Sequence, residues 1–65
     1  MDTISILGTK YRVYRDEQKT NLGYGYQFYA YIGGAYLFVG SGFFNTKNKT
    51  AALLEFKRGS EEEEV

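Results

Sequence analysis

Few residues in this chain of 65 have side chains suited to catalysis. It contains no histidine and no cysteine, which removes the usual base near neutral pH and the thiolate nucleophile. The serines Ser5, Ser41 and Ser60 have no plausible general base beside them. Asp16 and Glu17 are adjacent in a polar stretch, which is typical of a solvated turn. No side chains show the spacing of metal ligands. The sequence therefore predicts a protein that is not an enzyme and has no metal or cofactor.

Aromatic side chains are the remaining candidates for binding chemistry. The segment Tyr24–Phe44 holds five of the 7 tyrosines and four of the 5 phenylalanines. Such rings either fill a core or form a surface that binds through apolar contact and stacking. Which of the two applies depends on the elements that position them.

Alternating apolar and polar residues predict four β-strands, joined by short turns. Gly8-Thr9 is predicted to form a two-residue type II′ turn, and Gly33-Gly34 is a strong hairpin signal. Asp16–Gly23 is expected to be a polar loop, and Gly40-Ser41-Gly42 is expected to end the last strand. The predicted strands span residues 3–7, 10–15, 24–32 and 35–39.

A C-terminal helix is predicted after the strands. Asn45 or Thr46 supplies a capping oxygen, and Gly59 is the expected stop. Ala52, Leu53 and Phe56 form its apolar stripe. We therefore expect an α+β fold, in which a four-stranded antiparallel β-meander has one C-terminal α-helix packed on one face. Residues 1–59 form the single domain, and residues 60–65, with the run Glu61–Glu64, form a disordered acidic tail.

The two turns determine which side chains share a face, because a two-residue turn sets the register. They predict that Ile6 lies opposite Tyr11, Ile4 opposite Val13, and Phe28 opposite Val39. The predicted core face, covered by the helix, consists of Ile4, Ile6, Tyr11, Val13, Phe28, Ala30, Ile32, Leu37 and Val39.

The opposite face of the predicted sheet has no helix left to cover it. Tyr31 is expected opposite Tyr36, and Tyr29 opposite Phe38. This places an exposed aromatic surface beside a basic edge, of the size at which an exposed patch usually has a function. The predicted partner-binding residues are Lys10, Arg12, Tyr14, Gln27, Tyr29, Tyr31, Tyr36 and Phe38.

Three interpretations of this face stay open. The first is docking of a partner protein or a second copy of the chain, since such rings are frequent in interface centres. The second is nucleic-acid binding, in which bases stack on rings and basic groups neutralise phosphates. The third is that aromatic cross-strand pairs only stabilise a thin sheet. Residues 1–59 carry a net charge of only +4, which favours a protein partner because nucleic-acid-binding domains are strongly basic.

Composition also bounds where the protein acts. No apolar run approaches the ~18 residues of a membrane span, and the N-terminus shows no basic-then-apolar leader. We expect a cytoplasmic protein without membrane partners or a small-molecule cofactor. A small, tyrosine-rich chain without proline or cysteine also suits a phage or mobile-element accessory protein, such as an inhibitor of a host defence complex.

Two families show related patterns. The stretches "YRVYRD", "YQFYAYIGGAYLFVGS" and "GFFNTKNKTAALLEFKR" resemble the YegP-like repeat family of uncharacterised bacterial and phage proteins. That resemblance implies strands, an aromatic-Ser/Thr-Lys entry and an alanine-containing helix, with no assigned function. The stretches "KYRVYR", "AYI" and "GFFNTKNKTAA" resemble the three-stranded DNA-reading domains of the AP2 and integrase arm-binding kind. That second resemblance implies DNA contacts from several arginines and tryptophans on the sheet, whereas this chain has no tryptophan and has tyrosines there.

Overall fold

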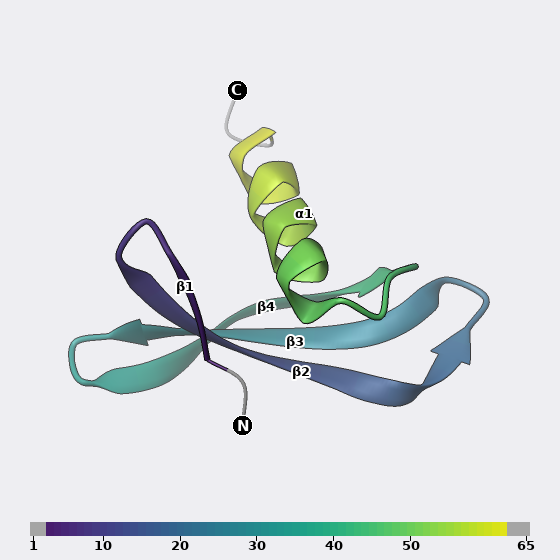
Figure 1. The fold of residues 1–65 in the computed structure, drawn as a ribbon, viewed down its shortest axis with the longest axis horizontal. Helices are drawn as coiled ribbons and strands as arrows, with labels where there is room; N and C mark the ends of the chain where they lie inside the picture. Colours follow the sequence, from purple (N-terminus) through teal and green to yellow (C-terminus); the bar gives the residue numbers. More distant parts are fainter. Residues whose placement is uncertain (1–2, 63–65) are drawn as a thin grey trace.

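The protein folds as one antiparallel sheet with a helix on one side (Figure 1), in a computed structural model that describes residues 3–62. Each strand pairs with its neighbour in sequence, so the sheet order is β1-β2-β3-β4. This confirms the predicted α+β meander. The elements are β1 (Thr3–Ile6), β2 (Thr9–Thr20), β3 (Gly23–Ile32), β4 (Ala35–Phe44) and α1 (Lys49–Glu62).

The first hairpin turns at Leu7 and Gly8. Both residues have positive φ, 50° and 83°, as a type I′ turn requires. Ile6 therefore lies opposite Thr9, and Ile4 opposite Tyr11. The predicted turn at Gly8-Thr9 is therefore wrong by one residue, and the predicted register of the two strands is wrong by two. Because side chains alternate with a period of two, this shift leaves the same residues on each face.

The predicted polar loop between the second and third strands is mostly strand. β2 continues to Thr20, which lies opposite Gly23. The Thr20 hydroxyl donates to the Gly23 carbonyl (2.8 Å) and accepts from the Leu22 N–H (3.1 Å), which fixes a tight turn. An irregularity between Arg15 and Lys19 absorbs the change of register. The charged residues of this stretch therefore lie on an extended ribbon.

The second hairpin turns at Gly33-Gly34, as predicted. Ile32 lies opposite Ala35, and both glycines have positive φ, 60° and 90°. Beyond Phe38 the register changes at a β-bulge, so that Phe28 lies opposite Gly40 rather than opposite Val39. The expected interruption at Gly40-Ser41-Gly42 is wrong, because the bulge lets β4 continue to Phe44.

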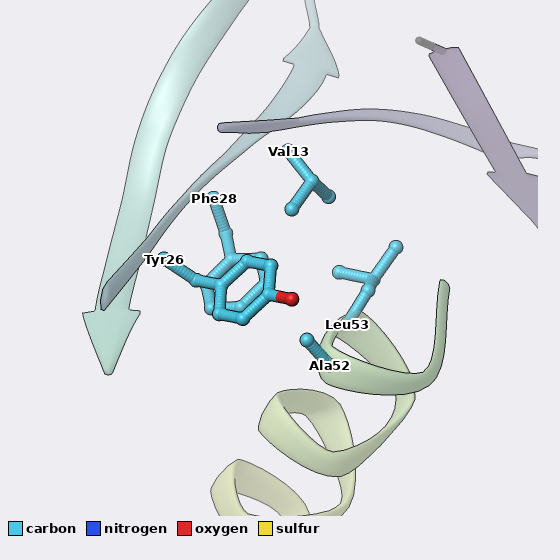
Figure 2. Packing of buried hydrophobic residues seen from close by; sticks show 5 residues of the cluster. All are labelled: Val13, Tyr26, Phe28, Ala52 and Leu53. Atoms are coloured by element: carbon cyan, nitrogen blue, oxygen red, sulfur yellow. The ribbon is translucent and has the colours of Figure 1, made fainter. Parts of the chain in front are cut away.

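The core lies between the sheet and the first turns of α1. Figure 2 shows Tyr26 and Phe28 of β3 and Val13 of β2 pointing toward Ala52 and Leu53 of the helix. All five are buried, with exposed fractions of 2% or less. The Tyr26 hydroxyl donates to the Thr46 carbonyl, which ties the connection before the helix to the sheet.

Helix α1 begins later and ends later than predicted. Asn48 is its cap, because its Oδ1 accepts from the N–H groups of Thr50 (2.9 Å) and Ala51 (3.2 Å). The expected stop at Gly59 is wrong, since the helix continues to Glu62. An isolated glycine costs a helix only about 1 kcal/mol relative to alanine. The rest of the predicted acidic tail, residues 63–65, lies outside the described residues.

The helix covers only part of its face of the sheet, because it rises away from the strands after its first turns (Figure 1). Phe56 packs on the sheet there, with its ring centroid 4.4 Å from that of Phe28. The predicted core residues Ile32, Leu37 and Val39 lie nearer the tip of the β3–β4 hairpin and are exposed to 52%, 49% and 41%. Their assignment to the core is therefore wrong.

Candidate binding face

The face of the sheet opposite α1 carries the residues that were predicted to bind a partner. Strand alternation places all of them there, since the side chains on β2, β3 and β4 that fill the core point the other way. Lys10 lies nearest β1, opposite Ser5. We call this surface the aromatic face and define it as Arg12, Tyr14, Gln27, Tyr29, Tyr31, Tyr36, Phe38 and Phe43.

The rings of the aromatic face contact one another edge to face. Tyr31 and Tyr36 are opposite each other, and so are Tyr29 and Phe38, as predicted. Their ring centroids are 5.0 and 5.5 Å apart. Tyr14 of β2 approaches Tyr29 at 5.5 Å with the ring planes 88° apart. Each of these pairs has the tilted geometry that aromatic quadrupoles prefer.

Arg12 is the cation at the centre of this surface. It lies opposite Tyr29 in the sheet, and its guanidinium carbon is 3.9 Å from the centroid of the Tyr36 ring. A guanidinium at this distance is attracted by the negative face of the ring. The Arg12 Nε is buried and has no hydrogen-bond partner within the described residues. Arg12 therefore fills one face of Tyr36 and leaves a donor unpaired.

Exposure divides the aromatic face into an outer and an inner group. Phe38, Phe43, Tyr31 and Tyr14 are exposed to 58%, 51%, 45% and 42%. The remaining members, Arg12, Gln27, Tyr29 and Tyr36, are half-buried between them. The four outer rings thus present an apolar surface to solvent, and the inner group supports it.

Asp16 and Phe43 lie in this region but were not among the predicted partner-binding residues. A Cβ built on Gly25 would lie 2.5 Å from the Asp16 carboxylate and 3.5 Å from the Phe43 ring. Both side chains therefore reach over the same glycine of β3. Phe43 was missed because the strand was expected to end before it. The signal was the alternation of Ser41 and Phe43, which continues the face of Phe38 once a bulge is allowed.

A groove lies on the other side of the sheet. A groove of about 660 Å³ runs between α1 and the β3–β4 hairpin. Lys57 closes one side by donating to the Tyr11 hydroxyl (3.1 Å). The groove is the space that the helix leaves open where it departs from the strands. Its apolar lining includes Ala30, Ile32, Val39 and Phe56.

Comparison with known proteins adds no relative. No family model matches the chain, and no curated protein or solved structure matches it. The resemblances to the YegP-like family and to DNA-reading domains stay predictions. Within the part of the chain that the structure describes, no helix is long and apolar enough to cross a membrane. The same residues include no cluster of acidic, histidine or cysteine side chains arranged to hold a metal ion.

Proposed function

We propose that this protein is a non-catalytic binding module whose aromatic face docks onto a partner protein or a second copy of the chain. The observation that supports this most is the exposure of the four outer rings. Tyr14, Tyr31, Phe38 and Phe43 lie on one face and are all between 42% and 58% exposed. Exposed aromatic surface of this extent is costly in water, and covering it releases that cost.

The inner group gives the surface the character of a protein interface. Tyrosine and arginine are the residue types that most often dominate binding energy in interface centres. Tyr29 is already held between Tyr14 and Phe38, so little side-chain freedom is lost on docking. Arg12 is half-buried with its guanidinium against the Tyr36 ring, and it adds a positive charge that favours a partner carboxylate at this position.

Nucleic-acid binding through the same face is the second candidate. It is favoured by the basic side chains of Lys10 and Arg12, which lie on this face beside the rings. Two features weigh against it. The guanidinium of Arg12 already lies on one face of Tyr36, where a base would stack. The carboxylate of Asp16 reaches over Gly25 and would repel phosphates.

The two candidates are separated by binding to mixed-sequence DNA and RNA at low and physiological salt. We expect no binding even at low salt, where counterion release favours it most. Binding that weakens steeply with salt would support the nucleic-acid candidate instead.

The protein-binding proposal is tested by capturing partners from the native host with tagged protein. The double variant Tyr31→Ser/Phe38→Ser removes two outer rings, and Leu54→Ser is the matched control because Leu54 is 50% exposed on the helix. We expect the wild type and the control to retain one specific partner and the double variant to lose it. If the double variant is unfolded by circular dichroism, the rings serve stability instead. If the protein is a phage or mobile-element accessory protein that inhibits a host defence complex, the captured partner should be a subunit of that complex.

A further inference from the structure

The outer edge of β4 is a second surface available for association, through the N–H and C=O groups of its main chain. β4 is the last strand in the sheet order and ten residues long, Ala35–Phe44. The opposite edge, β1, has only four residues. An exposed strand edge presents unpaired N–H and C=O groups that pair readily with another strand.

Natural edge strands are usually blocked by charged residues, proline or short length. β4 contains no charged residue and no proline. Its blocking feature is the bulge at Val39, between the pairs Phe28–Gly40 and Tyr29–Phe38. The regular part of the open edge is therefore the segment Ala35–Val39.

The hairpin geometry shows which main-chain groups point outward. Ile32 and Ala35 flank the two-residue turn, so this pair is hydrogen bonded within the hairpin. Hydrogen-bonded and non-hydrogen-bonded pairs then alternate along the strands. It follows that Ala35 and Leu37 direct their N–H and C=O groups to β3, whereas Tyr36 and Phe38 direct theirs to the free edge.

We propose that two copies of this chain pair antiparallel through the β4 edge, with Leu37 of each copy opposite Leu37 of the other on a two-fold axis. In this register Tyr36 lies opposite Phe38 of the second copy, and each such pair exchanges two main-chain hydrogen bonds. The two alternative axes, at Tyr36 or Phe38, would use the turn glycines or cross the bulge. Only the Leu37 axis uses both outward residues and stays within Ala35–Val39.

A second copy fits this edge better than a charged partner strand. An antiparallel two-fold brings each strand against itself, so any charge on it would face a like charge. β4 has none. Pairing also sets Tyr36 against Phe38, an aromatic cross-strand pair of the kind that Phe38 already makes with Tyr29. It covers Leu37 and Val39, the two apolar side chains of this strand that α1 leaves 49% and 41% exposed.

This edge pairing goes beyond the proposed function, because it uses the main chain of β4 and leaves the rings of Tyr14 and Tyr31 open. The two copies would form a continuous eight-stranded sheet with the aromatic faces side by side. Such a dimer doubles the surface that a partner protein can contact. The dimer would therefore be a bivalent binding module, with one aromatic face from each copy.

The absence of cysteine from the chain makes a single-cysteine variant a direct test. Facing residues of a non-hydrogen-bonded pair have Cα atoms about 4.5 Å apart, within the range that a disulfide bridges. Under mild oxidation we expect Leu37→Cys to give a covalent dimer. Ala35→Cys is the matched control on the same strand and face. It would lie about 13 Å from its own counterpart, too far for a disulfide.

Sedimentation velocity of the untagged proteins completes the test. We expect a wild-type dimer that Leu37→Lys weakens about tenfold or more, because two like charges then face each other. Leu54→Lys, at a residue of similar exposure on the helix, and Tyr31→Ser should leave the dimer intact. A wild-type monomer at every concentration, or cross-linking of Ala35→Cys in place of Leu37→Cys, would overturn the pairing. A dimer that is lost with Tyr31→Ser and kept with Leu37→Lys would also overturn it and would indicate face-to-face association, as in the proposed function.

Discussion

Removal of one hydroxyl group, in Tyr26→Phe, tests how the helix is attached to the sheet. Tyr26 is fully buried, and its hydroxyl donates to the Thr46 carbonyl just before the helix cap at Asn48. The phenylalanine ring keeps the stacked contact with Phe28 at 6.0 Å and the edge contact with Phe44 at 5.9 Å. The change therefore isolates the hydrogen bond from the packing.

The expected loss of stability follows from leaving a partly buried acceptor unpaired. A lost hydrogen bond of this kind costs about 1–2 kcal/mol, and a domain of this length has only about 3–10 kcal/mol of unfolding free energy in total. The melting temperature should fall by roughly 5–15 °C, measured by circular dichroism and checked by urea titration with an unchanged m-value.

Tyr31→Phe is the matched control for this measurement, since it removes a hydroxyl from a ring that is 45% exposed. It should change the unfolding free energy by less than about 0.5 kcal/mol. If Tyr26→Phe and Tyr31→Phe melt at the same temperature as the wild type, the hydroxyl of Tyr26 does not hold the connection to the sheet.

Two further changes concern glycine and the first turn, and both are measured by thermal unfolding. In Gly40→Ala, the new Cβ would lie 2.5 Å from the Phe56 ring, so the ring must shift from its present position on Phe28, and a loss of about 1–3 kcal/mol is expected. Gly59→Ala is its control, because open space surrounds that Cβ and alanine should stabilise the helix by about 0.5–1 kcal/mol; equal effects of the two would contradict the close approach of Phe56. Leu7→Asn should stabilise the first hairpin by up to about 1 kcal/mol, because Leu7 has a φ of 50° that asparagine tolerates better. A lower melting temperature for Leu7→Asn would contradict the turn at Leu7-Gly8.

Alternation and the Gly-Gly turn were sufficient to predict the sheet and its aromatic face. Gly33-Gly34 set the register of Tyr31 with Tyr36 and of Tyr29 with Phe38, and the structure has both pairs. The first turn was misplaced, since Leu7 rarely adopts positive φ and nothing local favours it over the pair Gly8-Thr9. The assignment of side chains to the two faces was still correct, because the register moved by an even number of residues.

The parts that could not be predicted depend on contacts distant in sequence. The bulge at Val39 changes the register by one residue, which an alternating pattern cannot reveal in advance. The direction of α1 depends on where Phe56 meets Gly40 and where Tyr26 meets Thr46. With these contacts, the helix lies away from the hairpin tip. Ile32, Leu37 and Val39 are therefore exposed rather than part of the core.

The central claim is that the sheet face opposite the helix is the surface that a partner covers. Hydroxyl-radical footprinting with mass spectrometry, on the free protein and on its complex with the captured partner, tests this directly. We expect oxidation of Tyr31 and Phe38 to fall several-fold in the complex, while Leu54 and Leu22, which are 50% and 68% exposed elsewhere, react as before. Protection of Leu54 with Tyr31 and Phe38 unchanged would place the partner on the helix and contradict the claim.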